Sequence, residues 1–485
     1  MFDVVVLGGG PAGVTAALRA RELGASVALI ERNRLGGTCT NDGCVPTRSL
    51  AKAARLVRDA EQFALYGLSA PKPEVNFRDV LARTQQVVYL VHEKKQLLDH
   101  LMDMEIQVYS EAGDTHFVDA HTLQLGNGDT VQGERIIICV GGHARKLPFP
   151  GAEFTLTHSD VWRLDHLPKS VAIVGTGATG CQLASIFEAF GSEVTLVDIA
   201  PRILLTEDRS VADLMAEQLE ESGINMLLGI KGIERVEKID EGLSLIYSTD
   251  EGEATCEAEA VILSVGWPGN VDHLGLDSAG VEVEKSYIKV DDYLRTSVPH
   301  IYAAGDITGK MMLVQSASMQ ARTAVENALL PDDVEIHHTL VPHGGFTDPE
   351  YAGVGMTEAQ ARESHDVIVA KVPYSELDRA VIDGRTVGFC KLIVDKQTQQ
   401  VIGAHVVGEQ AVEVVQIVSA GMAGELTVDK LASLELAYPT FAAIVGLAAR
   451  QIVRELGVVP VAAEWRALAR VRAAEWERLD RHDDV

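Results

Sequence analysis

Residues 2–13 read FDVVVLGGGPAG, and the stretch from Phe2 to Glu31 decides the fold. Its pattern predicts a buried apolar strand, a glycine-rich turn, an alanine-rich helix and a second strand that ends at Glu31. This order is typical of the βαβ unit that binds a dinucleotide, whose three glycines here are Gly8, Gly10 and Gly13. The glycines let the backbone approach a pyrophosphate at the positive end of the helix, and the acid accepts hydrogen bonds from a ribose diol.

The same pattern recurs at residues 171–180, which read VAIVGTGATG and lead through a helix to a strand that ends at Asp198. Its glycines are Gly175, Gly177 and Gly180. An acid in the ribose position repels a 2′-phosphate, so NAD(H) is expected over NADP(H), although Arg202 lies close enough to accommodate a phosphate. Two dinucleotide sites in one chain are most simply explained by a flavin in one and a nicotinamide in the other.

A pair of cysteines directly follows the first unit, in the segment GGTCTNDGCVP at residues 36–46. On a regular helix, Cys39 and Cys44 would be separated by a rise of about 7.5 Å, whereas disulfide Cα atoms lie within about 7 Å. A bond between them therefore requires a distorted turn, for which Gly43 supplies the freedom. A cysteine at a helix start also has a lowered pKa, so the pair is predicted to be redox-active.

Size and charge limit the classes of function. A chain of 485 residues is expected to form two to four domains, and its formal net charge of −28 argues against nucleic-acid binding. No apolar run is long enough to span a membrane. The apolar N-terminus lacks a basic leader, so a cytoplasmic protein is expected.

The cysteine segment resembles the active-site signature of the pyridine nucleotide–disulfide oxidoreductases, which include lipoamide dehydrogenase, glutathione reductase and mercuric reductase. Other segments resemble the same family, namely IIICVGGHARKLP (136–148), IYAAGDITG (301–309), FTDPEYAGVGMTE (346–358) and GFCKLIVD (388–395). The resemblance implies an α/β fold with two Rossmann-type dinucleotide-binding domains and a C-terminal α+β dimerisation domain. The implied boundaries are 1–147 and 269–335 for the FAD domain, 148–268 for the NAD(P) domain and 336–460 for the dimerisation domain. Helical spacing of apolar residues further predicts an amphipathic helix at 461–485.

The resemblance also implies how the cofactors and the redox pair are used. Electrons would pass from NAD(P)H to FAD and then to the disulfide, with Cys44 against the flavin and Cys39 toward a small-molecule acceptor. The chain would form a homodimer in which Tyr438 completes the partner's active site. Further FAD positions carried over by the resemblance are Gly37, Thr38, Arg48, Gly113, Gly141, Asp306 and Val314, and a further NAD position is Gly266.

The chain departs from the family where the acid–base dyad is expected. Tyr438 replaces the histidine and Ala443 the glutamate. A phenol with a pKa near 10 cannot act as a base at neutral pH as imidazole does, although it can donate a hydrogen bond. Mercuric reductase resembles this chain in having a tyrosine there, but its C-terminal cysteine pair is missing, because no cysteine follows Cys390.

A second departure concerns the lysine–glutamate pair that the family places near the flavin, where this chain has Arg48 and Gln182. A positive charge without an anionic partner is expected to stabilise reduced flavin and raise its potential. The aromatic residue that covers the family's flavin corresponds to Ala178.

No metal site is expected. Three histidines near the start of the third domain, His337, His338 and His343, are interpreted as residues of a solvated loop.

Three functions remain open. One is an NAD(P)H-driven reductase of an acceptor that needs little base catalysis, such as a quinone, a metal ion, a dye or a small oxidant. The others are a dihydrolipoyl dehydrogenase that tolerates the lost dyad, and a non-catalytic FAD-containing redox sensor.

Overall fold

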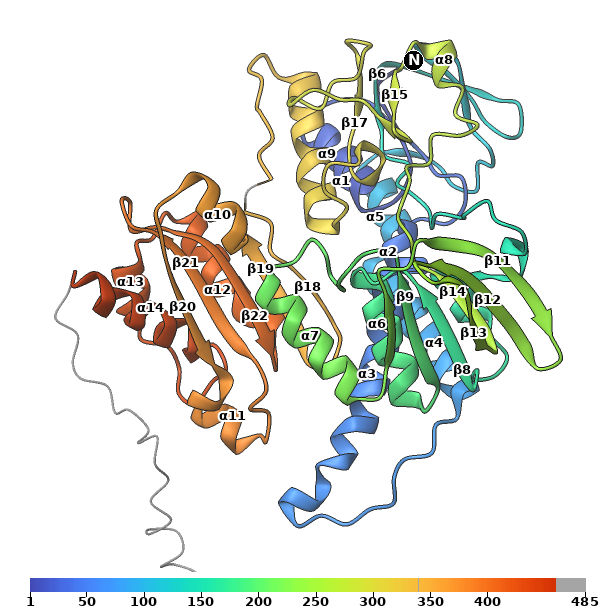
Figure 1. Ribbon diagram of the computed structural model, residues 1–485. Helices are drawn as coiled ribbons and strands as arrows, with labels where there is room; N and C mark the ends of the chain where they lie inside the picture. The colour runs from blue at the N-terminus through green and yellow to red at the C-terminus, as the bar shows by residue number, and fades with distance from the viewer. Residues whose placement is uncertain (339, 459–485) are drawn as a thin grey trace, which may run out of the picture. The chain divides into compact units, whose positions relative to one another are not determined.

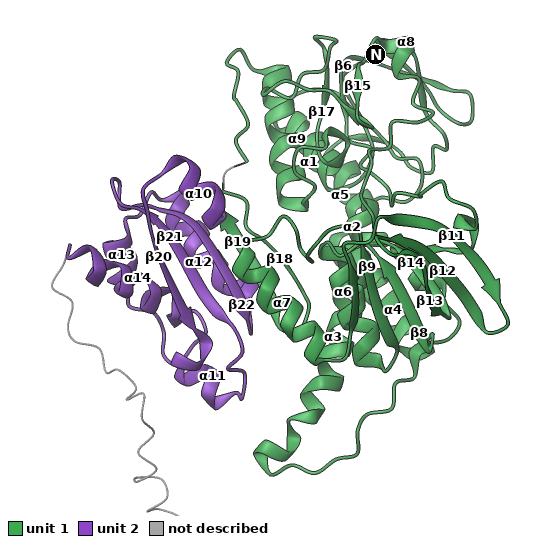
Figure 2. Ribbon diagram, in the orientation of Figure 1, with its two compact units in different colours: residues 1–355 green, residues 356–485 purple. Residues whose placement is uncertain are grey.

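A computed structural model describes residues 1–338 and 340–458. The chain forms two compact units, residues 1–355 (unit 1) and 356–485 (unit 2), which Figure 2 colours separately. The amphipathic helix predicted at 461–485 lies outside the described residues. Mixed α/β structure with one parallel sheet and one largely parallel sheet confirms the predicted fold class. No helix within the described ranges is both long and apolar enough to cross a membrane.

The first βαβ unit forms as predicted at the centre of a sheet with the strand order β3-β2-β1-β6-β5-β4. The parallel strands β1 (Phe2–Leu7) and β2 (Val27–Ile30) are joined by α1 (Pro11–Glu22). The alanines of α1 are buried against the sheet and against α9 (Val314–Leu329), which lies beside α1 (Figure 1). The sheet is completed by β3 (Gln107–Tyr109), β4 (His116–Asp119), β5 (Thr122–Gln124), β6 (Thr130–Ile138) and β17 (Ile301–Ala303).

The second βαβ unit lies in a separate sheet with the strand order β10-β9-β8-β14-β7. It consists of β8 (Ser170–Val174), α6 (Ala178–Phe190) and β9 (Glu193–Asp198), and β8 pairs in parallel with both β9 and β14. The other elements around this sheet are β7 (Leu156–Thr157), α7 (Arg209–Glu221), β10 (Asn225–Leu228), β14 (Ala260–Leu263) and an antiparallel layer of β11 (Gly232–Ile239), β12 (Gly242–Thr249) and β13 (Gly252–Ala258).

Helices occupy the segment between β2 and β3. A short helix, α2 (Gly37–Asn41), is followed at once by the longer α3 (Cys44–Glu61). The polar region near residues 75–110 contains α4 (Phe77–Lys95) and α5 (Leu97–Asp103), as its helical spacing predicts. Helix α3 packs between α4 and α6, so the segment that carries the cysteines contacts both dinucleotide-binding units.

Unit 1 ends with an antiparallel hairpin of β18 (His343–Gly345) and β19 (Glu350–Gly355). Unit 2 contains the antiparallel strands β20 (Val367–Pro373), β21 (Phe389–Asp395) and β22 (Val401–Gly408), close to where the sequence predicts them. Helix α12 (Ala411–Ala423) packs on β22, and α14 (Ala443–Leu456) packs on β20 and β21.

Candidate active site

The first glycine loop leaves no room for side chains. Gly8 has φ +107°, and a β-carbon on Gly13 would lie 1.7 Å from the Gly8 carbonyl oxygen. A β-carbon on Gly37 would lie 2.7 Å from the Gly10 Cα, so the two backbones approach closely. The N-terminus of α1 has no side-chain cap, which leaves its first N–H groups for a phosphate ligand. This cradle fits the pyrophosphate of a dinucleotide.

Glu31 lies beside this loop. Its Oε2 accepts a hydrogen bond from the Gly9 N–H at 2.7 Å, and its Oε1 accepts one from Asn33 N–H at 2.8 Å. Gly113, with φ +68°, lies close by, because its N–H donates to the Arg32 carbonyl at 3.1 Å. A carboxylate has about four acceptor positions, so Glu31 retains acceptor capacity for a ribose.

Three further residues predicted to contact FAD lie just after the ends of β6 and β17 and at the start of α9. Gly141 has φ +68°, and its carbonyl accepts from Asn270 N–H at 3.0 Å. Asp306 is the first residue of a short 3₁₀ helix, η4 (Asp306–Thr308); its Oδ2 accepts a hydrogen bond from the Trp267 indole at 2.9 Å, and burial raises the pKa of its carboxyl group. Val314 begins α9, two residues before the buried Ser316, whose hydroxyl has no partner among the described residues. An orphaned buried hydroxyl on the helix that packs against α1 fits a polar cofactor such as FAD.

The cysteine pair lies at a break between two helices. Asp42 ends α2, and Gly43 has φ −125° and ψ −99°, outside the main regions that other residues adopt. Cys44 then starts α3, and the Cys39 and Cys44 side chains are joined by a hydrogen bond. The distortion predicted at Gly43 is therefore present. Thr38, in the first turn of α2, accepts through its carbonyl a hydrogen bond from Asp42 N–H at 2.8 Å, which stabilises the break.

The two thiols have opposite acidities. The hydrogen bond from Cys39 lowers the pKa of Cys44 to about 7. The same bond, followed by burial, raises the pKa of Cys39. The reduced pair therefore favours a thiolate on Cys44 and a protonated Cys39 at neutral pH.

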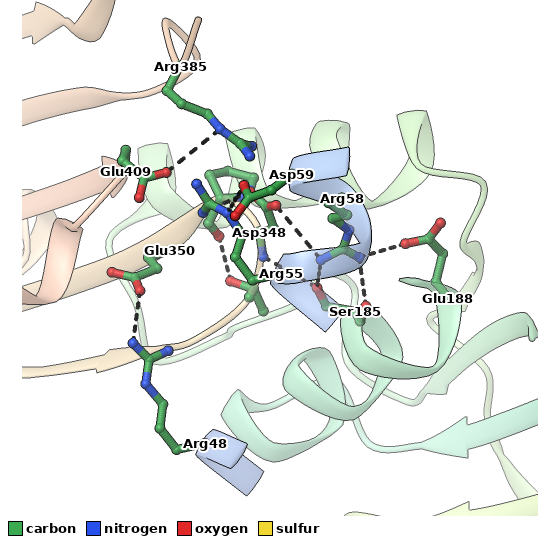
Figure 3. A network of polar contacts seen from close by, with 12 residues as sticks. Arg48, Arg55, Arg58, Asp59, Ser185, Glu188, Asp348, Glu350, Arg385 and Glu409 are labelled. Carbon is green, nitrogen blue, oxygen red and sulfur yellow. Dashed lines mark hydrogen bonds and ion pairs between the residues drawn. The ribbon is translucent and has the colours of Figure 1, made fainter. Parts of the chain in front are cut away.

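Arg48 has an anionic partner, so the expectation of an uncompensated charge is wrong. Its Nη2 lies 3.5 Å from Glu350 Oε1 (Figure 3), and its guanidinium lies 3.8 Å from the centre of the Phe346 ring. Gln182 instead accepts a hydrogen bond from the Phe346 N–H at 3.2 Å and donates to the Ala178 carbonyl at 3.0 Å. Sequence reasoning missed Glu350 because it lies some three hundred positions from Arg48 and comes from a hairpin rather than from the helix α6.

Two further arginines of α3 join the same network. Arg58 donates to Ser185 Oγ at 3.0 Å and pairs with Glu188 at 2.6 Å, and both partners belong to α6 (Figure 3). Arg55 pairs with Asp59 at 2.7 Å and lies 3.9 Å from Asp348. These contacts connect the helix that begins at Cys44 to the helix of the second βαβ unit.

The second glycine loop repeats the geometry of the first. Gly175 has φ +105°, and a β-carbon on Gly180 would lie 1.9 Å from the Gly175 carbonyl oxygen. Gly177 is the N-cap of α6 and has no side-chain cap. Gly266, with φ +127°, follows β14 on the same side of the sheet, and its carbonyl accepts from Arg145 N–H at 3.0 Å.

Asp198 and Arg202, the residues predicted to distinguish NAD(H) from NADP(H), are both hydrogen-bonded within their own loop. Asp198 Oδ2 accepts from Thr176 N–H at 2.7 Å, and its Oδ1 accepts from Ala200 N–H at 2.9 Å. The Arg202 guanidinium donates to the carbonyls of Leu204, Leu205 and Glu207. Arg202 is thus already engaged with its own loop.

In unit 2, Tyr438 is exposed and donates a hydrogen bond of 2.5 Å to Asp378. This bond raises the pKa of the phenol further above its usual value. Ala443 begins α14 and offers no acid–base group. A phenol that holds its proton this firmly cannot accept one from a thiol at neutral pH.

The histidines differ from the expected solvated loop in two of three cases. His337 is exposed, but His338 is half-buried and bonds Gln320 at 3.0 Å. His343 lies in β18 and pairs with Glu207 at 3.1 Å, which raises the pKa of its imidazole. The described residues contain no group of three metal-ligating side chains.

Comparison with known proteins decides the family. The model of the pyridine nucleotide-disulphide oxidoreductases matches residues 2–321, and the model of the dimerisation domain of the same family matches residues 341–449. The chain belongs to this family. It is an FAD- and nicotinamide-dependent oxidoreductase, as its relatives are.

Relatives and solved structures cover nearly the whole chain. The dihydrolipoyl dehydrogenase of Zymomonas mobilis is 32% identical over 90% of this chain and 95% of its own length. The mercuric reductase of Staphylococcus aureus is 32% identical over 92% of this chain and 82% of its own. The HOCl-induced flavoprotein disulfide reductase RclA from Escherichia coli aligns with a TM-score of 0.82 and 29% identity, over 93% of this chain and 100% of that chain. LpdA from Mycobacterium tuberculosis aligns with a TM-score of 0.84 and 27% identity, over 93% and 99%.

Proposed function

We propose that this family member passes electrons from NADH to the Cys39–Cys44 disulfide and then to an acceptor that needs no protein base, with a metal ion as the first candidate. The observation that carries the proposal is the combination of an acidic Cys44 thiol with a Tyr438 that cannot act as a base. The first step converts NADH, a proton and the disulfide into NAD⁺ and the dithiol. Two Cu(II) ions would then take one electron each, restore the disulfide and release two protons.

The cofactor contacts rest on the geometry of the two loops. We assign Gly8, Gly10, Gly13, Glu31 and Asp306 to FAD, and the loop around Gly175 with Asp198 to the nicotinamide cofactor. Other proposed FAD positions are Gly37, Thr38, Arg48, Gly113, Gly141 and Val314, and Gly177, Gly180 and Gly266 complete the NAD site. When bound, FAD would supply the two-electron chemistry between the nicotinamide and the disulfide.

Asp198 and Arg202 support a preference for NAD(H), and the dimerisation-domain match supports the assembly. The Asp198 carboxylate opposes a 2′-phosphate, and Arg202 is committed to three backbone carbonyls, which favours NAD(H). The dimerisation-domain match supports a homodimer. In a dimer, we propose that Tyr438 reaches the partner's redox centre as a hydrogen-bond donor.

The metal-ion acceptor is supported by the structural neighbour RclA, which has been solved as a Cu(II) complex. A metal ion neither gains nor loses a proton when it is reduced, so no acid–base group is needed on the acceptor side and the lost dyad costs little. Dihydrolipoyl dehydrogenase remains the second candidate, because relatives of that name match this chain at 32–33% identity.

An acceptor panel tests the proposal. NADH oxidation is measured with chelated Cu(II), a quinone, a dye and lipoamide, using the native protein, Cys39→Ser and Cys44→Ser. We expect Cu(II) reduction that falls by at least about tenfold in both variants. Cu(II) reduction that is unchanged in both variants would show that the cysteines do not carry the electrons to the metal, and absence of any NADH oxidation would refute the activity.

A further inference from the structure

Side chains in the last turn of α4 form hydrogen bonds with residues that lie between the two cysteines. His92 Nε2 lies 2.7 Å from Asn41 Oδ1, and Lys95 Nζ donates to Thr40 Oγ1 at 3.1 Å. Asn41 donates in turn to the Leu35 carbonyl at 3.1 Å. Two side chains from one helix turn thus contact two of the four residues that separate Cys39 from Cys44.

The packing around this turn is close. Thr40 is fully buried, and a β-carbon on Gly36 would lie 3.1 Å from the His92 ring and 3.3 Å from the Thr40 hydroxyl. Lys95 is exposed, and its bond to Thr40, which directly follows Cys39, favours a position of the ammonium group beside the cysteine segment.

Charged groups from several elements lie around the cysteine segment. The hydrogen bond between Cys39 and Cys44 has the largest effect on the pKa of both thiols. Smaller electrostatic effects come from Asp306 of η4, which raises the pKa of both, and from Lys95 of α4, which lowers the pKa of both. Arg48, on α3, is paired with Glu350. Asp42, in the turn itself, hydrogen-bonds Ser159 and lies 3.7 Å from His158. Lys95 thus supplies a positive charge near the redox pair, and its effect on the pKa of the two thiols is opposite in sign to that of Asp306.

We infer that Lys95 is a positioning residue of the redox centre, which adds to the hydrogen bond from Cys39 in stabilising the thiolate of the reduced Cys39–Cys44 pair at neutral pH in a chain that lacks the histidine–glutamate dyad. The inference rests on the proposed function, because it names the group that supports the thiolate of the reduced pair. In the reduced state, one proton leaves to solvent, the other stays on Cys39, and the resulting charge is stabilised by the ammonium group. His92 acts through Asn41 by holding the turn.

The first test is the pH dependence of thiol alkylation. Each full-length protein is reduced, reacted with iodoacetamide from pH 5 to 10 and analysed by mass spectrometry at both cysteines. Lys95→Met should move the midpoint upward by about half a pKa unit, which from a pKa of about 7 slows the reaction at pH 7 about twofold. Lys95→Glu should slow it further, and Lys95→Arg should resemble the native protein. Lys94→Met, on the adjacent exposed lysine, is the matched control.

A purely structural role is distinguished by two further measurements. Thr40→Val removes the hydrogen-bond partner of Lys95 but keeps the lysine charge. The pH profile of alkylation should therefore shift less in Thr40→Val than in Lys95→Met. Added salt should reduce the difference in midpoint pH between the native protein and Lys95→Met, because screening weakens the interaction between the ammonium group and the thiolate. A Lys95→Met profile that superimposes on the native profile overturns the inference, as does a Thr40→Val shift equal to that of Lys95→Met.

The flavin readout separates failure of this inference from failure of the proposed function. In the reduced holoprotein, the thiolate-to-flavin charge-transfer band should titrate with the same shift in Lys95→Met. If no protein shows the band but alkylation still depends on the charge at position 95, the flavin coupling is wrong and the role of Lys95 holds. If the band appears and neither profile depends on that charge, the role of Lys95 is wrong and the coupling holds.

Discussion

The Arg48 guanidinium lies 3.5 Å from the Glu350 carboxylate, so helix α3 and strand β19 share an ion pair one helix turn after Cys44. The glutamate that the family places on the NAD-domain helix is Gln182 here, and it contacts the Phe346 backbone instead. Negative charge has thus not been lost from this region but is supplied by another element.

Glu350 is expected to set the flavin potential. Glu350→Gln leaves Arg48 without its carboxylate, and the remaining positive charge should stabilise reduced flavin. We expect the two-electron potential to rise by about 30 mV, equivalent to about 1.4 kcal/mol, in a redox titration against a dye. Glu153→Gln, on an exposed glutamate, is the control, and an unchanged potential in Glu350→Gln would show that the pair has no influence on the flavin.

The cysteine pair should give a pH-dependent charge-transfer band. The hydrogen bond from Cys39 lowers the pKa of Cys44 to about 7, below the usual value for a thiol. Since the thiolate is the basic form, the long-wavelength band of the reduced protein should be present above pH 7 and be lost as the pH falls through about 7.

Variants of the two cysteines test the assignment of the thiolate. Cys44→Ser should abolish the band, and Cys39→Ser should show it without reductant. Cys39→Ala also removes the hydrogen-bond donor, so its midpoint should lie above that of Cys39→Ser. A band that persists in Cys44→Ser is incompatible with the assignment.

The cofactor preference should depend on Asp198 and not on Arg202. We expect kcat/KM to be at least about tenfold higher with NADH than with NADPH, a difference of about 1.4 kcal/mol. Asp198→Asn should reduce this ratio, because it removes the charge that repels a 2′-phosphate. Arg202→Gln should leave the ratio unchanged, since the guanidinium bonds three carbonyls of its own loop. A native protein that uses both cofactors equally would contradict the assignment.

Local patterns allowed much of the fold to be predicted from the sequence. The glycine spacing and the acids at positions 31 and 198 predict both βαβ units, because these features act within some thirty residues. The distortion at Gly43 also follows from local geometry. Glu350 and Lys95 could not be predicted, since each reaches the cysteine segment through tertiary packing of a distant element. The contact of His343 likewise could not be predicted, because its partner Glu207 is remote in sequence.

The central claim is that the loss of the dyad directs this enzyme away from dithiol substrates. Oxidation of a dithiol needs removal of thiol protons, to which a positioned base contributes about 10²–10⁴-fold. Tyr438 is hydrogen-bonded to Asp378 and holds its proton, and Ala443 has no acid–base group.

The most direct measurement compares, in one preparation, the turnover of dihydrolipoamide with NAD⁺ and that of a quinone or Cu(II) with NADH. We predict at least about a hundredfold lower rate with dihydrolipoamide, and a gain in that rate in the Tyr438→His, Ala443→Glu double variant. Comparable rates with both kinds of substrate in the native protein would contradict the account.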